Sequence, residues 1–261
     1  MVSGRRERKL KDLIYGRQPV LEALRAEKRI FERLILRRGV TGEVVEEILH
    51  LAQKLHLPVE WQEEAALQGM VGDVAHQGVI LVTVPRASRS WQDFLRDVAG
   101  NPQMLVGFVD RIEDPRNLGA IIRTASFFGF RGLLVSKART TPLHAQAVKA
   151  ACGGVEFLEL FQVNNFVGVI RAFKERGFFL VGMEEDAPTL LWDVDVRTVP
   201  VGLVVGGEDQ GIRKLVRSEC DFLVRIPPLG GIASLNASVA FGIGAYEVIR
   251  QKRGVLNVEK R

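Results

Sequence analysis

The sequence predicts an α/β protein in which a mostly parallel sheet is preceded by a smaller α/β unit. In the C-terminal part, short apolar runs typical of strands alternate with helical stretches, which favours a parallel sheet covered by helices on both faces. With 261 residues, 47% of them hydrophobic, the chain can bury one large domain or two ordinary ones. Ligands of such sheets bind at the carboxyl ends of the strands.

The N-terminal part is expected to hold a basic flexible arm, residues 1–12, and an α/β domain, residues 13–85. Its apolar patterns predict elements in alternating order. Helices are expected at 16–26, 41–56 and 63–72, and strands at 31–38, 58–62 and 76–85. A polar segment with one short helix, residues 86–103, is interpreted as a linker.

The second domain is expected at residues 104–252, followed by a tail at 253–261. Its apolar runs predict six strands, at 104–110, 132–136, 156–160, 178–183, 201–207 and 222–227. Helical patterns lie between or after them, at 117–128, 142–151, 164–176, 212–219 and 235–252.

Residues 226–246 carry no charged side chain, although 26% of the whole chain is charged. A membrane span needs about 20 apolar residues, but two prolines and two glycines interrupt the first half, and Ser234, Asn236 and Ser238 are polar. We expect instead a tight loop and then a helix that Ser234 caps and that is packed on most of its sides. Such a loop can also hold a ligand close to the backbone.

The composition limits the cellular setting and the chemistry. The first residues contain no apolar stretch, so we expect no signal peptide. Cys152 and Cys220 do not make a disulfide framework, and the four histidines lack metal-ligand spacing. We therefore expect a cytoplasmic protein with no metal site and no membrane partner.

Positive charge is concentrated near the N-terminus. Residues 1–40 contain twelve lysines and arginines against five acids, whereas the net charge of the whole chain is only +5. This excess favours a polyanion partner, most simply nucleic acid, over a merely solvated helix face. The candidate phosphate contacts in the arm are Arg5, Arg6, Arg8, Lys9 and Lys11.

The strand expected at 104–110 leads into a helix with two unusual polar residues. Asn117 is placed to cap that helix. Arg123 lies among apolar residues, where a buried guanidinium without a partner would be costly. It therefore either extends to the surface or points at a substrate phosphate or an acid.

Two further strand ends carry candidate site residues. The apolar strand at 201–207 ends in Gly206 and Gly207, where a ligand can approach the backbone, and is followed by Glu208. Glu208 is either an exposed acid of a glycine turn or a partner for Arg123. The third strand end is the uncharged segment, with Ser234 and Asn236 at its helix start.

Several enzyme classes lack their motifs in this sequence. It contains neither a G-x-G-x-x-G fingerprint after a strand nor a phosphate-binding G-x-x-x-x-G-K-[ST] loop. This argues against Rossmann dehydrogenases, Rossmann-type methyltransferases and P-loop NTPases. The sequence also lacks a serine nucleophile elbow and a convincing Cys/His pair.

Taken together and in order, the three segments resemble the SpoU (TrmH) family of RNA ribose 2′-O-methyltransferases, within the SPOUT superfamily. The matching residues are Asn117, Gly119 and Arg123, then G-x-E-x-x-G at 206–211, then I-P-x-x-G-x-x-x-S-L-N-x-S-V-A at 226–240. The stretches IYGRQPVLEALR and HQGV also look like the substrate-binding domain of members that act on 23S rRNA guanosine. The resemblance covers residues 13–250.

The resemblance implies a SPOUT-type sheet with a deep trefoil knot, in which the uncharged segment is the threaded piece. It implies that S-adenosylmethionine is the cofactor, held by backbone groups at Gly206, Gly207, Ile226 and Leu235. It also implies a homodimer formed through the knot region, with the RNA site at the dimer interface.

The resemblance further assigns the chemistry to Arg123, Asn117, Glu208, Ser234 and Asn236. Arg123 would hydrogen-bond the ribose 2′-oxygen or an adjacent phosphate, since arginine resists losing its proton. Glu208 would orient Arg123, and the other three would position substrate or cofactor groups. The leading hypothesis is an rRNA guanosine methyltransferase. The alternatives are a tRNA ribose methyltransferase and a non-catalytic RNA-binding or ribosome-assembly factor.

Overall fold

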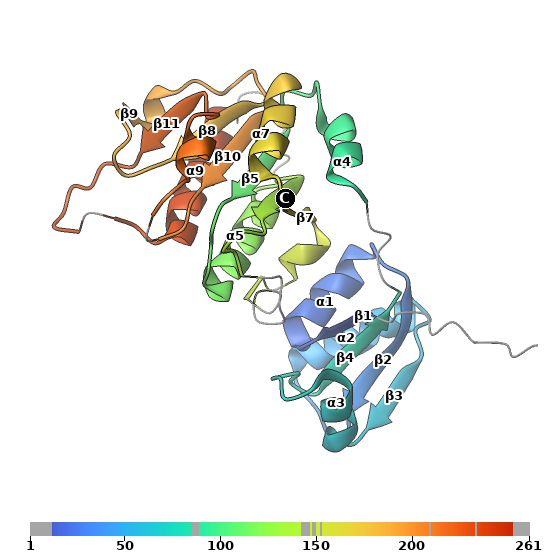
Figure 1. Ribbon diagram of the computed structural model, residues 1–261. Coiled ribbons are helices and arrows are strands. Elements are labelled where there is room, and N and C mark those ends of the chain that lie inside the picture. Colours follow the sequence, from blue (N-terminus) through green and yellow to red (C-terminus); the bar gives the residue numbers. More distant parts are fainter. Residues whose placement is uncertain are drawn as a thin grey trace, which may run out of the picture. The chain divides into compact units, whose positions relative to one another are not determined.

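The chain divides into two compact units, Met1–Ser88 and Arg89–Arg261 (Figure 1). The computed structural model describes residues 12–84, 89–141, 147, 150–151, 153–208, 210–232 and 234–252. The predicted basic arm, the tail at 253–261 and most of the helix predicted at 142–151 lie outside the described residues.

Unit 1 is a four-stranded sheet in the order β1-β4-β2-β3. Only the β2–β3 pair is parallel, while β4 runs antiparallel to both β1 and β2. In chain order the elements are β1 (Asp12–Tyr15), α1 (Arg17–Ala26), β2 (Phe31–Arg37), α2 (Glu43–Lys54), β3 (Val59–Gln62), α3 (Glu64–Val71) and β4 (Val79–Thr83).

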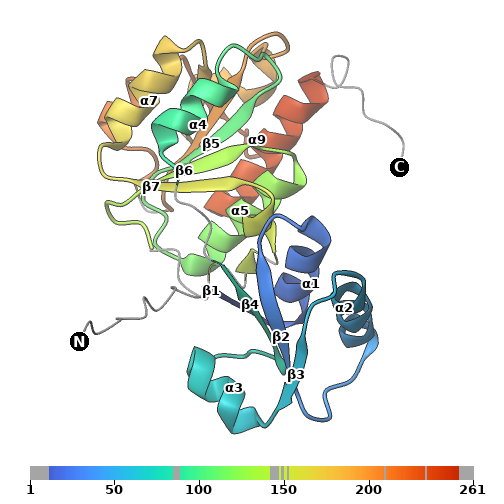
Figure 2. The same ribbon diagram turned by 90° about the vertical axis from the view of Figure 1, so that its right-hand side faces the viewer.

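Alternating side chains give this sheet two buried faces. Leu34 and Leu36 of β2 pack with α1 and α2, whereas Ile35 between them packs with Leu67 of α3. Figure 2 shows α3 on one side of the sheet and α1 with α2 on the other. The helices and three of the strands lie where the sequence predicts them, and β1 is an additional strand of only four residues.

Unit 2 is a seven-stranded sheet in the order β7-β6-β5-β10-β8-β11-β9, and all of its strand pairs are parallel. Its strands are β5 (Leu105–Val109), β6 (Gly132–Ser136), β7 (Glu159–Val163), β8 (Phe179–Met183), β9 (Thr189–Leu190), β10 (Val201–Val205) and β11 (Phe222–Arg225). Its α-helices are α4 (Trp91–Val98), α5 (Pro115–Phe127), α7 (Phe166–Glu175), α8 (Lys214–Arg217) and α9 (Ala237–Lys252).

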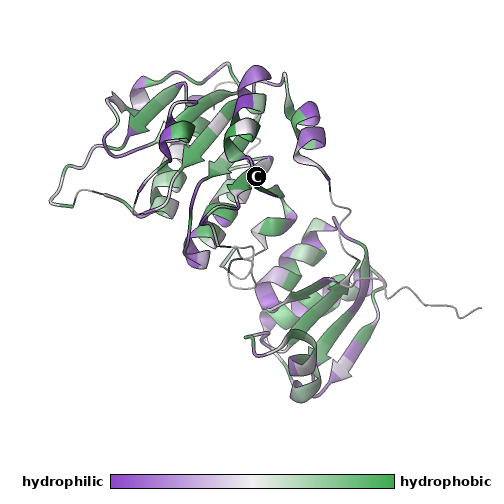
Figure 3. Cartoon of the chain, viewed as in Figure 1, coloured by the Kyte–Doolittle hydropathy of each residue, from purple (hydrophilic) through white to green (hydrophobic). Residues whose placement is uncertain are grey.

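Helices cover both faces of this parallel sheet, as the sequence predicts. One buried cluster joins α5 and α9 to the sheet, and the other joins α4, α7 and α8 to its opposite face. Figure 2 shows these two helical layers, and Figure 3 shows that the strands between them are mostly hydrophobic. The α/β fold class is therefore confirmed, while the knot stays a prediction.

Two boundaries differ from the sequence prediction. The strand expected at 156–160 begins only at Glu159, because Gly154–Glu156 forms a 3-10 turn. The short helix placed in the linker is α4, which buries Phe94, Leu95 and Val98 in the core of unit 2.

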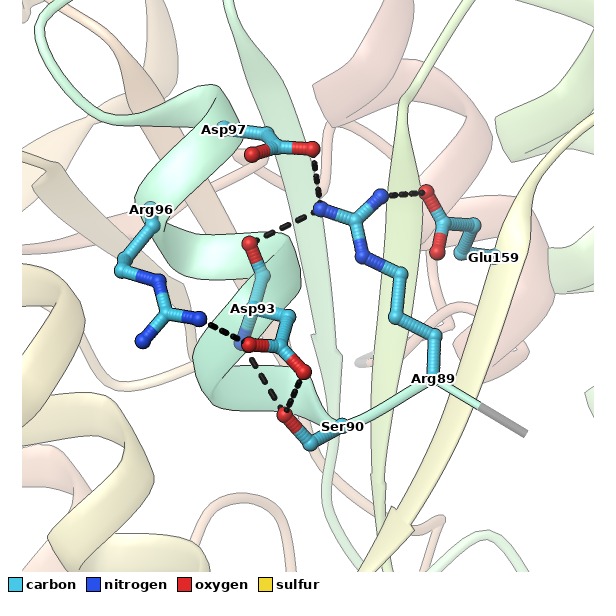
Figure 4. A network of polar contacts seen from close by, with 6 residues as sticks. All are labelled: Arg89, Ser90, Asp93, Arg96, Asp97 and Glu159. Carbon is cyan, nitrogen blue, oxygen red and sulfur yellow. Dashed lines mark hydrogen bonds and ion pairs between the residues drawn. The ribbon is translucent and has the colours of Figure 1, made fainter. Parts of the chain in front are cut away.

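A polar network fixes the chain where it enters unit 2 (Figure 4). Arg89 donates to the Asp93 carbonyl oxygen at 2.8 Å, to the Asp97 carboxylate, and to Glu159 of β7 at 3.3 Å. Ser90 caps α4 by accepting from the Asp93 backbone N–H at 3.1 Å. Arg89 thus ties the start of the unit to one helix and to the edge strand.

Helix α9 packs on most of its sides, as the sequence predicts, and leaves one stripe exposed at Val239, Ile243, Tyr246 and Arg250. Phe241, Ala245 and Val248 face the core, whereas Ile243 and Tyr246 are exposed by 38% and 58%. Within the described residues, no helix is long and apolar enough to cross a membrane.

The last residue of α9, Lys252, is fully buried. Its ammonium group donates to the carbonyl oxygens of Val199 at 2.7 Å and Pro102 at 2.8 Å. These carbonyls precede β10 and β5, so Lys252 holds the end of α9 to the entry of two central strands. Burial lowers the pKa of Lys252 to about 8, because the charged form loses hydration.

We expect the stability of the protein to rise between about pH 8 and pH 10.5 through Lys252. In that range the folded chain has released a proton that the unfolded chain still binds, so the free energy of unfolding increases with pH. The gain is on the order of 1–3 kcal/mol. Urea unfolding across this range, compared with Lys252→Met, measures it; identical pH slopes for the two proteins would contradict the assignment.

Candidate active site

A pocket of about 840 Å³ opens at the carboxyl ends of β8, β10 and β11. Loops supply most of its wall, and the start of α9 completes it. The lining residues are 183–186, 205–208, 210–211, 226–232 and 234–237, together with Arg217, Val224 and Ala240. The cofactor residues predicted from the sequence, Gly206, Gly207, Ile226 and Leu235, all line this pocket, as do Glu208, Ser234 and Asn236.

The loop after β10 is folded so tightly that it requires glycine. A Cβ atom on Gly206 would lie 2.0 Å from the carbonyl carbon of Gly211, and one on Gly207 would lie 2.3 Å from the carbonyl oxygen of Arg111. Gly211 has a φ of +59° and donates its N–H to the Gly207 carbonyl oxygen at 2.9 Å. The turn therefore presents backbone rather than side chains to the pocket.

Glu184, at the end of β8, supports the same turn. Its carboxylate accepts from the Ile212 backbone N–H at 2.6 Å, and its side chain is 8% exposed. Burial raises the pKa of Glu184, although the Ile212 hydrogen bond opposes this shift. Glu184 is not among the site residues predicted from the sequence. The sequence does carry a signal for it, which is an acid directly after an apolar strand.

A buried ion pair holds the continuation of this loop. Asp110, directly after β5, is fully buried and lies 2.7 Å from the Arg213 guanidinium. Asp110 also accepts from the Arg213 backbone N–H at 3.2 Å, and Arg213 donates to Ser136 at the end of β6 at 3.1 Å. These contacts fix residues 212–213 to the ends of two neighbouring strands.

The side chain of Asn117 connects the three segments that the sequence analysis picked out. Its amide nitrogen donates to the Glu208 carboxylate, and its amide oxygen accepts from Asn236 at 3.0 Å. Ser238 lies 3.5 Å from the same oxygen. One residue of α5 thus contacts both the loop after β10 and the start of α9.

Two predicted helix caps are wrong. The cap of α5 is Asp114, whose carboxylate accepts from the Arg116 backbone N–H at 2.8 Å, so Asn117 is free to bond across to other loops. The residue that caps α9 is Asn236 and not Ser234, because Asn236 accepts from the Ser238 backbone N–H at 2.9 Å.

Arg123 lies two turns further along α5, on the exposed side of the helix, and is not among the residues that line the described pocket. Asn117 donates to Glu208, the residue that Arg123 was predicted to contact. The structure therefore assembles Asn117, Glu208 and Asn236 beside the pocket, with Ser234 on its wall, while the catalytic role of Arg123 stays a prediction. Arg5, Arg6, Arg8, Lys9 and Lys11 lie outside the described residues.

Comparison with known proteins follows the division into two units. A family model described as "SpoU rRNA Methylase family" matches residues 104–246, and one described as "RNA 2'-O ribose methyltransferase substrate binding" matches residues 13–89. The 23S rRNA (guanosine-2'-O-)-methyltransferase RlmB of Pseudomonas aeruginosa is 34% identical over 92% of this chain and 96% of its own length. An uncharacterized tRNA/rRNA methyltransferase of Mycobacterium avium is also 34% identical, over 93% of this chain and 78% of its own length.

Among solved structures, the SpoU methyltransferase AviRb from Streptomyces viridochromogenes, in complex with the cofactor AdoMet, is similar with a TM-score of 0.74. It is 26% identical and the match covers 96% of this chain and 94% of AviRb.

Fold, site and relatives define an RNA ribose 2′-O-methyltransferase. The chain belongs to the SpoU rRNA methylase family, and the resemblance seen in the sequence is confirmed. Because SpoU methyltransferases depend on S-adenosylmethionine, the predicted cofactor is confirmed as well.

Proposed function

We propose that this protein methylates the ribose 2′-hydroxyl of a guanosine in 23S rRNA. The observation that carries the proposal is the pocket at the strand ends, beside which Asn117 joins two of the loops. The choice of guanosine in 23S rRNA is supported by the similarity to RlmB over nearly the whole chain. Unit 1, which matches a substrate-binding domain, is assigned to RNA binding.

The residues of the pocket fit S-adenosylmethionine. A volume of about 840 Å³ is typical of sites for ligands of this size. Gly230 and Gly231 leave open space where side chains would stand, so backbone groups are accessible on that wall. Glu184, Glu185 and Asp186 line one wall together with Arg217, which lies 3.7 Å from Glu184 and 3.2 Å from Asp186. Three acids against one arginine leave this wall negative, which suits a ligand with sulfonium and ammonium charges. When bound, the cofactor supplies a methyl group activated as a sulfonium.

The protein must stabilise the 2′-oxygen of the ribose, which is too weakly acidic to ionise at neutral pH. We assign this role to Arg123, which donates hydrogen bonds to the developing alkoxide or to the adjacent phosphate. An arginine keeps its proton, so it acts as a donor. As the new O–C bond forms, the S–C bond to the methyl group would break to leave a neutral thioether, and the hydroxyl proton would pass to water. Asn117, Glu208 and Asn236 are assigned to hold the loops in position, and Ser234 to contact the substrate or the cofactor.

We propose that the protein is a homodimer formed through α5 and α9. Phe127 of α5 is 82% exposed, and Val239, Ile243 and Tyr246 of α9 are exposed by 48%, 38% and 58%. The rings of Phe127, Phe128 and Tyr246 form a chain with centroid distances of 5.1 and 6.4 Å. An exposed apolar surface of this kind fits a second copy of the chain, because a two-fold dimer buries the same patch on both subunits. Arg123 precedes Phe127 by one helical turn and borders this surface.

The direct test of the function is methyl transfer with isotope-labelled S-adenosylmethionine to rRNA and tRNA from cells that lack this protein. We expect labelled 2′-O-methylguanosine in the large-subunit rRNA alone, detected by nucleoside mass spectrometry. We expect Arg123→Ala to slow the transfer by at least about 100-fold, the cost of losing a donor to a developing oxyanion. Its cofactor affinity should be unchanged, because Arg123 lies outside the pocket.

Three results would overturn parts of this proposal. Label in tRNA would refute the rRNA assignment and keep the chemistry. If no RNA is labelled and the protein does not bind the cofactor, the assignment as a methyltransferase is refuted. Near-normal turnover of Arg123→Ala would refute its role at the 2′-oxygen.

The dimer is tested with Ile243→Glu, which places a charge on the exposed face of α9. We expect the wild type to sediment at twice the chain mass of 29.0 kDa, and the variant at the chain mass, because burying an unpaired charge in an interface is costly. Leu215→Glu is the matched control. Leu215 is 68% exposed and belongs to α8, which packs on the opposite face of the sheet from α5 and α9, so this variant should remain a dimer. A monomeric wild type would contradict the proposal.

A further inference from the structure

Unit 1 has a crevice of its own, with a volume of about 380 Å³. It lies at the end of the sheet where β1 and β2 finish and β4 begins, and the start of α3 closes one side. Its lining residues are Arg17, Arg37, Glu64 and the segment 74–78. Arg17 and residues 76–78 belong to the two stretches that resemble the substrate-binding domain, but the resemblance gives none of them a role, and the pocket of unit 2 does not include them.

Buried polar contacts fix one wall of this crevice. His76 is 3% exposed; its Nδ1 atom accepts from the Gly78 backbone N–H at 3.1 Å, and its Nε2 atom lies 3.0 Å from Glu64. The second oxygen of Glu64 lies 3.4 Å from the Arg37 guanidinium. Glu64 is therefore shared between His76 and Arg37. Within the part of the chain that the structure describes, Glu64 is the one carboxylate paired with Arg37, which leaves most of the five guanidinium donors for a ligand.

Arg17 approaches from the opposite side. Its backbone N–H donates to the side-chain oxygen of Gln77 at 3.0 Å, and its Nε atom lies 3.5 Å from the Gln77 carbonyl oxygen. Gln77 has a φ of +54°, a conformation that non-glycine residues rarely adopt. Among the described residues, no carboxylate lies within ion-pair distance of Arg17. Gly42 makes room for it, because a Cβ there would lie 3.2 Å from Nη1 of Arg17.

We propose that this crevice is a subsite for one nucleotide of the RNA substrate, whose phosphate is bound by Arg17 and Arg37. The inference rests on the proposed function for the identity of the ligand as RNA. Two guanidinium groups face a single carboxylate that is already engaged, so the crevice favours an anion. Its volume is at the lower end of that of small-molecule sites, which suits a single unstacked nucleotide and excludes a duplex.

Gln77 is a positioning residue in this subsite. Its side-chain oxygen fixes the start of α1, and its carbonyl oxygen contacts the Arg17 side chain. Gln77→Glu would retain an acceptor for the Arg17 backbone N–H and would place a negative charge beside the guanidinium. This isosteric change therefore opposes phosphate binding while keeping the local fold.

The test measures the affinity of the full-length protein for in vitro-transcribed 23S rRNA at several salt concentrations. We expect Arg17→Ala, Arg37→Ala and Gln77→Glu each to weaken binding about tenfold at low salt. We expect the slope of log affinity against log salt to become shallower by about one in the arginine variants. S-adenosylmethionine affinity should stay at the wild-type value, because unit 2 contains that pocket.

Arg25→Ala is the matched control. Arg25 lies on the same helix as Arg17 but pairs with Glu22 and Glu47 and does not line the crevice. The subsite is overturned if the three variants have the same RNA affinities and salt slopes as Arg25→Ala. Methyl transfer by the wild-type protein would in that case leave the proposed function intact. A wild type that neither binds nor methylates RNA would overturn the proposed function itself. Thermal melting identifies any variant that fails to fold. If an arginine variant fails, the RNA affinity of Gln77→Glu decides whether the subsite exists.

Discussion

The side-chain amide of Asn117 is the interaction on which the site depends. It is the point where α5, the loop after β10 and the start of α9 meet, because one group donates to Glu208 and accepts from Asn236. The three segments are far apart in the chain and are brought together only by the order of the parallel strands. An amide suits this position because it offers donors and an acceptor on adjacent atoms.

The turn that Asn117 contacts is rigid for two independent reasons. Gly206, Gly207 and Gly211 allow backbone to pack on backbone, which no side chain would permit. Glu184 and the Asp110–Arg213 pair then hold the following residues to the ends of three strands. A loop held in this way presents fixed backbone donors and acceptors to a ligand at little entropic cost.

The apolar and polar patterns of the sequence predicted the fold class and the segments that form the site. They did not predict which side chains of these segments contact one another. Apolar alternation identified most strands of unit 2, since a buried parallel strand needs a continuous apolar run. The helix caps were wrong because Asn, Ser and Asp are similarly good caps, and tertiary contacts decide which one is used. The sequence predicted Asn117 and Ser234 as the caps of α5 and α9, whereas Asp114 and Asn236 cap these helices.

Two other features were not accessible from sequence pattern. The helical repeat of α9 marks its apolar residues but not which of them face the core, so the exposure of Ile243 and Tyr246 appears only in the fold. The polar partner of Glu208 is Asn117, which lies 91 residues earlier in the chain, and no spacing rule predicts a contact of that range.

The most direct test of the central claim is a double-mutant cycle on Asn117→Ala and Asn236→Ala, with S-adenosylmethionine affinity measured by calorimetric titration. If the amide contact sets the geometry of the cofactor pocket, the two substitutions are coupled by about 0.5–3 kcal/mol, as for residues in one hydrogen-bond network. The second substitution then costs less than it does alone. Strictly additive losses, or unchanged cofactor affinity in both single variants, would contradict the claim that this contact holds the site together.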